Sequence, residues 1–248
     1  MPGERLDERL LREGLAESRT RAQALIRAGQ VLVDDTPHDK PGTRVADGAR
    51  IRLRSEPKRF VSRGGEKLAG ALDDLGVDPG GRDCLDVGAS TGGFCDCLLQ
   101  RGARSVVAVD VGYGQLDARL RDDPRVHVLE RTNARHLEPA ALPGPVSLVT
   151  VDVSFISARL LLPALERCAP AADWLVMVKP QFEVGRERVG KGGVVRDDAL
   201  RQEAADAVAN AAAERGFAEV GRVDSRLAGP KGNREIFLLL RPAPVAGP

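Results

Sequence analysis

The sequence contains few aromatic residues and no long apolar run. Phe, Trp and Tyr together make up 3% of its 248 residues. A hydrophobic core must therefore be built mainly from Leu, Val, Ala and Ile, and a surface that reads single-stranded bases by stacking is not expected. No apolar stretch approaches the roughly 20 residues that a helix needs to span a bilayer. We therefore expect a protein that does not contact a membrane.

Cysteine is also scarce, and its four positions do not suggest a metal site. The chain opens on charged residues, MPGERLDERLLREG, rather than on a secretory signal, so we expect a cytoplasmic protein with free thiols. Cys95 and Cys97 form a C-x-C pair on a predicted helix, where their side chains point in different directions. A tetrahedral zinc site would need a second pair of Cys or His nearby, and the sequence offers none. The remaining cysteines are Cys84 and Cys168.

The net charge of +1 excludes a polycation, but basic residues concentrate near the start of the chain. The segment up to Arg59 is rich in Arg and net positive, so the remainder is slightly negative. A basic segment joined to a nearly neutral body is typical of a module that faces RNA or DNA. A solvated charged face is the alternative interpretation. The arginines on the predicted helices of this segment are Arg12, Arg19, Arg21 and Arg27.

Residues 1–54 predict a small module of two helices and a small sheet. Leucines recur at helical spacing, and Gly14 is placed to end the first helix. Ser18 is placed to cap a second helix, which Gly29 closes. The stretches QVLVDD and VADGARIRL predict short strands, the second after an Asp-Gly turn. The leucines are Leu6, Leu10, Leu11 and Leu15.

The same segment resembles an S4 RNA-binding domain over residues 5–54. The resemblance is carried by RLD-x-x-L, GLAESR, A-x-x-LI-x-x-G-x-V-x-V-D and KPG-x-x-V-x-DG. It implies binding of structured RNA, mainly through shape and phosphate contacts. We expect an S4 domain at 1–54, a linker at 55–61 and a second domain at 62–248. The residues that we expect to bind RNA are Arg5, Arg12, Arg19, Arg21 and Arg27.

A helix is predicted directly after the linker. The stretch RSEPKRF interrupts any periodicity, and SRGGEKLAGALDDLG then has apolar residues at helical spacing up to Gly76. Lys67 falls in the first turn of this helix, where the macrodipole disfavours a positive charge. Such a placement is a weak indication of function.

The rest of the chain alternates apolar strand candidates with amphipathic helix candidates. The strand candidates are DCLDVG, SVVAVDV, RVHVLE, VSLVTVDV, WLVMVKP and IFLLLR. The helix candidates are GGFCDCLLQRG, SARLLLPALERCA and DDALRQEAADAVANAAAERG. This alternation predicts a parallel sheet covered on both faces, a doubly wound Rossmann-like α/β fold.

The stretch LDVGASTGGF, residues 85–94, predicts a strand that turns through glycines into a helix. A P-loop is excluded because no G-K-[ST] follows, and the dinucleotide pattern G-x-G-x-x-G fails. Asp86 lies on the strand, where a carboxylate would repel a pyrophosphate but suits a cationic ligand. Asp110 ends the next strand, about 20 residues on, where an acceptor for a ribose diol is expected. S-adenosylmethionine fits both acids, with NAD binding and a structural turn as alternatives.

Four charged residues are candidates for catalysis: Lys67, Asp152, Lys179 and Glu235. Asp152 and Lys179 lie at the ends of predicted apolar strands, so we expect their side chains to point into the ligand crevice. A ribose hydroxyl is a poor nucleophile, and methylating it needs a base in line with the methyl group. A lysine can serve if a neighbouring lysine and partial burial lower its pKa. For each residue alone, a solvated charge at a strand end is the alternative.

These motifs resemble the TlyA family, which joins an S4 domain to an FtsJ-like catalytic domain. The resemblance is carried by SRGGEKL, LDVGASTGGF, VDVGYGQL, VLERTNAR, VDVSFIS, VKPQFEVG and GNREIF, and spans residues 5–241. It implies an enzyme that methylates the 2′-hydroxyl of cytidines in 16S and/or 23S ribosomal RNA, using S-adenosylmethionine. We also expect a monomer that holds no metal. The implied catalytic tetrad is Lys67, Asp152, Lys179 and Glu235. The cofactor-binding residues expected are Asp86, Gly88, Ala89, Ser90, Thr91, Gly92, Gly93, Phe94, Asp110, Asn133 and Asp152.

Two rival functions and one departure from the family remain open. Members are often labelled haemolysin, although the sequence offers no strongly apolar amphipathic segment. An RNA-binding protein with a vestigial catalytic domain is the second rival. A pseudouridine synthase is a weaker alternative, because it would not need the glycine-rich turn.

The departure from the family lies in the linker. Phe60 stands where the family's best-known member has a tryptophan, and it lacks the indole donor. Residues 180–197 are glycine-rich and basic, and we expect this loop to close over RNA.

Overall fold

A computed structural model describes residues 3–54 and 59–244 of the chain. The chain divides into two compact units, Met1–Lys58 and Arg59–Pro248. The division falls within the expected linker, of which residues 55–58 lie outside the described residues. Phe60, at the far end of that linker, is buried in the second unit.

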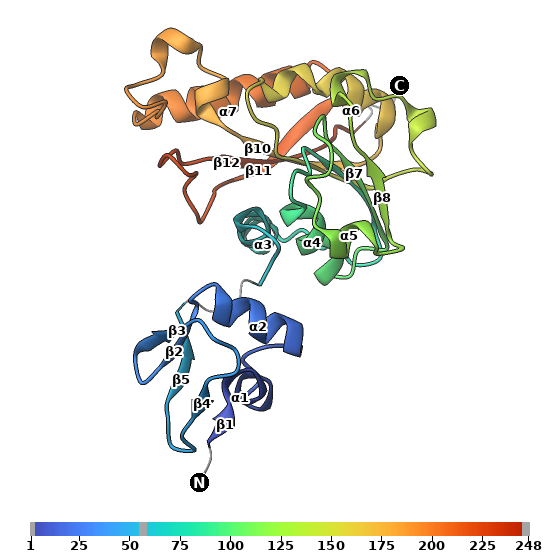
Figure 1. Cartoon of the computed structure of the whole chain (residues 1–248). Coiled ribbons are helices and arrows are strands. Elements are labelled where there is room, and N and C mark those ends of the chain that lie inside the picture. The colour runs from blue at the N-terminus through green and yellow to red at the C-terminus, as the bar shows by residue number, and fades with distance from the viewer. Residues whose placement is uncertain (1–2, 55–58, 245–248) are drawn as a thin grey trace. The chain divides into compact units, whose positions relative to one another are not determined.

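The first unit packs two helices against short strands around an apolar core (Figure 1). The capping role expected for Ser18 is confirmed, because its side chain accepts a hydrogen bond from the Arg21 N–H at 3.1 Å. The helices are α1 (Leu6–Arg12) and α2 (Arg19–Arg27). The strands are β1 (Glu4–Arg5), β2 (Val31–Val33), β3 (Thr36–His38), β4 (Arg44–Val45) and β5 (Ile51–Leu53).

The second unit is built on a seven-stranded sheet in the order β11-β12-β10-β9-β6-β7-β8. The prediction of a parallel sheet is wrong in one respect. Strand β12 pairs antiparallel with both neighbours, whereas β10, β9, β6, β7 and β8 run parallel. The strands are β6 (Asp83–Val87), β7 (Ser105–Val109), β8 (Val126–Leu129), β9 (Leu148–Val151), β10 (Asp173–Val178), β11 (Phe217–Asp224) and β12 (Ile236–Pro242).

Helices cover both faces of this sheet, as expected (Figure 1). Alternate residues of each strand enter two different cores. Leu85 and Val87 pack with α6 and α7, whereas Cys84 packs with α3 and α4. The helices are α3 (Arg63–Leu75), α4 (Gly93–Gln100), α5 (Ala118–Arg121), α6 (Leu162–Cys168) and α7 (Asp198–Ala213). Short 3-10 turns are η1 (Ala134–His136), η2 (Pro139–Ala141), η3 (Ala158–Leu160), η4 (Pro180–Phe182) and η5 (Arg186–Arg188).

The reversed strand determines what meets at one edge of the sheet. The parallel strands β6, β7, β9 and β10 all end at the same edge, and an antiparallel neighbour must begin there. Val178 at the end of β10 pairs with Ile236 at the start of β12. Residues that follow β10 and residues that precede β12 are therefore neighbours.

Candidate active site

The glycine turn after β6 brings the chain close to the end of β9. Gly88 has φ 89°, and a Cβ at this position would lie 2.5 Å from the carbonyl oxygen of Asp152. Only glycine fits both the left-handed backbone and this approach. The turn leads into α4, and Gly93 at the start of that helix packs against Ser62 and Gly65 of the α3 segment.

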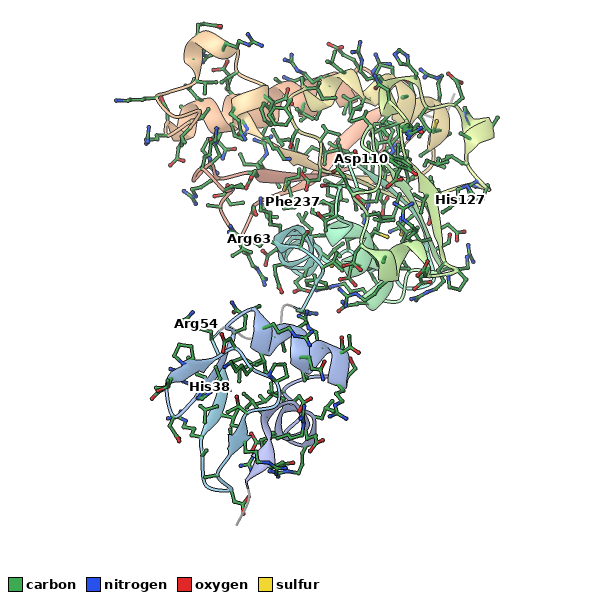
Figure 2. All side chains as sticks on the ribbon, in the orientation of Figure 1. His38, Arg54, Arg63, Asp110, His127 and Phe237 are labelled. Carbon is green, nitrogen blue, oxygen red and sulfur yellow. The ribbon has the colours of Figure 1, made fainter. Side chains whose placement is uncertain are left out.

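Asp110 connects the turn to the end of β7. One carboxylate oxygen accepts a hydrogen bond from the Ser90 N–H at 2.8 Å, and the other from the Gly112 N–H at 2.7 Å. Each oxygen has two lone pairs, so the carboxylate can accept further bonds from a ligand. Figure 2 labels Asp110 at this end of the sheet. With Asn133, whose side chain caps η1, Asp110 lines a cavity of about 390 Å³.

The sequence-predicted cofactor residues divide into two groups. Those that line this cavity or the larger one beside it are Gly88, Ala89, Ser90, Thr91, Gly93, Phe94, Asp110, Asn133 and Asp152. Asp86 and Gly92 line neither. Side chains alternate between the two faces of a strand, so Asp86 points away from the face that holds Leu85 and Val87. It lies on the α4 side of the sheet, where its carboxylate is fully buried.

Buried Asp86 lies beneath the turn rather than in the cavity. Thr150 Oγ1 donates a hydrogen bond to Asp86 Oδ1 at 3.0 Å, whereas Oδ2 has no partner among the described residues. Burial raises the pKa of this carboxyl to about 7, partly offset by the Thr150 hydrogen bond. Near neutral pH this carboxyl is therefore divided between its protonated and charged forms.

The four catalytic candidates meet at the larger cavity, which has a volume of about 1220 Å³. Lys67 Nζ donates a hydrogen bond to Glu235 Oε1 at 2.9 Å. Lys179 Nζ lies 2.5 Å from Asp152 Oδ1 and donates to Ser154 Oγ at 2.8 Å. Two ion pairs from four different segments therefore share one wall.

The cluster contains two lysines and two carboxylates, so its formal charges balance. Burial clearly shifts the pKa of one of the four groups, Asp152. Burial raises the pKa of Asp152, while Lys179 and then Lys67 lower it and Glu235 raises it further. The other three groups are therefore all close enough to act on the Asp152 carboxylate. Glu235 Oε2 is buried and has no hydrogen-bond partner among the described residues, and Glu235 itself lines the cavity.

Sequence reasoning missed three polar residues around this cluster. Ser154 accepts from Lys179, and Asn233 binds the backbone of residues 193 and 195 through its amide. Glu183 is buried and binds the start of η3. Ser154, Glu183 and Asn233 lie within VDVSFIS, VKPQFEVG and GNREIF, but nothing in those strings indicates that Glu183 and Asn233 are buried or that Ser154 binds Lys179.

In the first unit, the expected RNA-binding arginines have different surroundings. Asp7 is fully buried, and its partner Arg5, at 2.9 Å, holds the pKa of that carboxyl well below its usual range. Arg19 also binds Asp7, and Arg12 binds Glu4. Of the five expected arginines, Arg21 and Arg27 are exposed and form no ion pair with any of the described residues.

Neither a metal cluster nor a membrane-spanning helix is found in the described residues. No group of three or more His, Cys, Asp and Glu side chains there could hold a metal ion. No helix within residues 3–54 and 59–244 is long and apolar enough to cross a membrane.

Comparison with known families assigns both units. Residues 60–242 match the FtsJ-like methyltransferase family, and residues 4–51 match the S4 domain. The chain is 54% identical over 239 residues to the 16S/23S rRNA (cytidine-2′-O)-methyltransferase TlyA of Mycobacterium tuberculosis, covering 96% of this chain and 89% of that protein. It is 40% identical over 233 residues to Hemolysin A of Brachyspira hyodysenteriae, covering 93% and 97%.

Solved structures agree with these matches. A protein from Streptococcus thermophilus described as a haemolysin superposes with a TM-score of 0.74 at 40% identity, covering 98% of this chain and 90% of that one. The N-methyltransferase NodS of Bradyrhizobium japonicum superposes with a TM-score of 0.50 at 15% identity, covering 72% and 97%. The second likeness concerns the fold alone.

Proposed function

The chain belongs to the TlyA family of FtsJ-like methyltransferases with an S4 domain, and from this premise we propose that it methylates ribosomal RNA at the ribose 2′-hydroxyl of cytidine. The observation that carries the proposal is the meeting of Lys67, Glu235, Lys179 and Asp152 at one cavity beside the glycine turn. The partner is a ribosomal subunit, and the setting is the cytoplasm.

S-adenosylmethionine is the methyl donor that fits the site. Gly88 leaves room where a side chain would collide with Asp152, and the smaller cavity opens at this point. Asp110 would accept hydrogen bonds from the ribose diol, and Asn133 would lie beside the nucleoside. Asp152, which lines both cavities, would face the methyl end. When bound, the cofactor supplies an electrophilic methyl group on a sulfonium.

The remaining chemistry is assigned to the four charged residues. Lys179 is the proposed base or the final positioner of the 2′-hydroxyl, because it sits between Asp152 and Ser154 at the cavity wall. Glu235 would orient Lys67, which it already binds. To take the proton that leaves the hydroxyl, Lys179 must be the neutral amine, so its own proton would first pass to Asp152, whose pKa burial raises.

RNA would be bound by both units. Arg21 and Arg27 are exposed and form no ion pair within residues 3–54 and 59–244, so they are available to phosphates in the first unit. In the second, Arg186 and Lys231 line the larger cavity. Residues 180–197 would close over bound RNA, with their end fastened by Asn233. Equal proteolytic cutting of this loop with and without ribosomal subunits would contradict closure.

The test is transfer of labelled methyl groups from S-adenosylmethionine to 30S, 50S and 70S particles that lack the modification. Label in 16S or 23S RNA supports the proposal and identifies the subunit, with Lys179→Ala as the inactive control. Cofactor binding without label on any particle would favour the RNA-binding rival. If the purified protein lyses red cells and Lys179→Ala lyses them equally well, the haemolysin rival would be favoured.

A further inference from the structure

The loop that carries Asp152 contains a strained and exposed residue. Phe155 has φ 70°, and 88% of it is exposed to solvent. A left-handed backbone in a residue other than glycine costs on the order of 1–3 kcal/mol and persists only where its surroundings hold it. Burial does not hold Phe155, whose ring contacts only that of Phe182 among the described aromatic rings, at 5.5 Å between centroids. The ends of the loop must therefore hold it.

The upstream end is fixed by the sheet. The Asp152 N–H donates to the Val87 carbonyl at 2.9 Å, which continues the pairing of β6 with β9. Six residues then separate the end of β9 from η3, which begins at Ala158.

The downstream end is fixed by the carboxylate of Glu183. Its Oε1 accepts from the Ala158 N–H at 2.7 Å, and its Oε2 accepts from Ser157 Oγ at 2.5 Å and from Arg159 Nε at 3.2 Å. Burial raises the pKa of this carboxyl, and these three donors partly offset the effect. A buried carboxylate is costly unless it is hydrogen-bonded in this way, so the contact is specific to this loop.

Glu183 also belongs to the segment that carries Lys179. Its N–H donates to the Pro180 carbonyl at 3.0 Å within the η4 turn. Its side chain therefore joins the segment of Lys179 to the segment of Asp152, and Ser154 between them binds Lys179. Glu183 itself lines neither cavity, so it cannot act by touching a ligand.

We propose that Glu183 is a positioning residue for methyl transfer, which locks residues 152–158 against the η4 turn. The lock keeps Ser154 and Phe155 at the cavity wall beside the Lys179–Asp152 pair. This inference rests on the proposed function, because the reaction that it serves is the one proposed above.

The test measures the single-turnover rate of methyl transfer to saturating ribosomal particles at saturating S-adenosylmethionine. The variants are Glu183→Ala, Glu183→Gln, Ser157→Ala and the Glu183→Ala/Ser157→Ala double variant, with Glu138→Ala as an exposed control. Thermal unfolding and calorimetric cofactor binding show that each variant is folded. Glu183→Ala should lower the rate by about 10²-fold, the effect of roughly 1 Å of misplacement. Glu183→Gln, which keeps an acceptor for Ala158, should restore most of it.

The double variant separates positioning from general destabilisation. If Ser157 acts through Glu183, the double variant should be no slower than Glu183→Ala alone. A folded, cofactor-saturated Glu183→Ala protein with the wild-type rate would overturn the inference, and so would additive losses in the double variant. Absence of transfer by the wild-type protein would instead count against the proposed function.

Discussion

Lys67 Nζ lies 2.9 Å from Glu235 Oε1, although 168 positions of the chain separate the two residues. The contact exists because β12 runs against its neighbours, so the residue before it lies at the edge where the parallel strands end. In a parallel arrangement, that residue would lie at the opposite edge of the sheet. The reversal of one strand therefore completes the charged cluster, and the predictions below test the residues around it.

Lys179 should be essential for methyl transfer but not for cofactor binding. Lys179→Ala removes the proposed base, and the rate should fall by about 10²–10⁴-fold. Lys179→Arg keeps a positive charge beside Asp152 but cannot release its proton near neutral pH. We expect both variants to be inactive in single-turnover assays, with S-adenosylmethionine affinity close to wild type by calorimetry. An active arginine variant would show that Lys179 contributes only its charge.

Asp110 should govern cofactor affinity. Its replacement by Ala removes the proposed acceptor for the ribose diol and two hydrogen bonds to the turn. The Kd for S-adenosylmethionine should rise about 10- to 100-fold, as expected for bonds to a charged group. The matched control is Asp122→Ala, an exposed carboxylate outside both cavities. Equal affinity in the two variants would remove Asp110 from the site.

Gly88 should tolerate no side chain, for reasons beyond its backbone angle. Gly102 has a similar φ, 85° against 89°, but a Cβ there would meet nothing closer than 3.8 Å. Gly102→Ala should therefore cost only the left-handed strain, about 1–2 kcal/mol in urea unfolding. Gly88→Ala should cost more and also weaken cofactor binding, because its Cβ pushes on Asp152. Similar behaviour of the two variants would contradict the close approach.

Asp86 should make stability depend on pH. Its pKa in the folded protein, about 7, exceeds the ordinary value of 3.8, so the folded state binds the proton more tightly. The contribution of the protonated Asp86 carboxyl to the free energy of unfolding is fully present below pH 3.8, and it is lost as the pH rises to about 7. Asp86→Asn, which stays neutral, should gain stability over wild type between pH 4 and 7, by on the order of 4 kcal/mol at most. Urea unfolding at pH 5 and 8 measures this, and a pH-independent difference would be the contrary result.

The arginines of the first unit should separate into two roles. Arg21→Ala and Arg27→Ala should weaken RNA binding and each reduce its salt slope by about one, with unfolding unchanged. Arg5→Ala removes a partner of buried Asp7 and should instead destabilise this unit by about 1–3 kcal/mol. Hydrogen exchange of residues 3–54 in the full chain distinguishes the two. Faster exchange in the first two variants would assign them a structural role.

Much of the fold follows from local signals in the sequence. Gly76 ends α3 in the left-handed conformation, with φ 62°, and Ser18 caps α2, both as expected. The apolar strands were found because their runs of Val and Leu are long. Strand β11 was missed, because it lies at the sheet edge and its polar sequence, FAEVGRVD, is mostly not buried.

The sequence indicated which candidate residues could lie near one another, but not their geometry, and their roles stay predictions. The strand ends indicated Asp152 and Lys179, yet the direction of β12 is set by its pairing with β10 and β11 and cannot be read from its own residues. The pairing of Lys67 with Glu235 depends on that direction, whereas Lys179 and Asp152 follow the parallel neighbours β10 and β9. Burial of Asp86 depends on packing on the α4 side of the sheet, and burial of Glu183 on its contacts with residues 157–159, which local patterns do not reveal.

The most direct test of the account is the chemical identity of the product. Ribosomal RNA from methylated particles would be digested to nucleosides and analysed by mass spectrometry, with wild type and Lys179→Ala compared. The account predicts 2′-O-methylcytidine with the wild-type protein and none with the variant. A base-methylated nucleoside, a 2′-O-methylated nucleoside other than cytidine, or equal product from Lys179→Ala would contradict it.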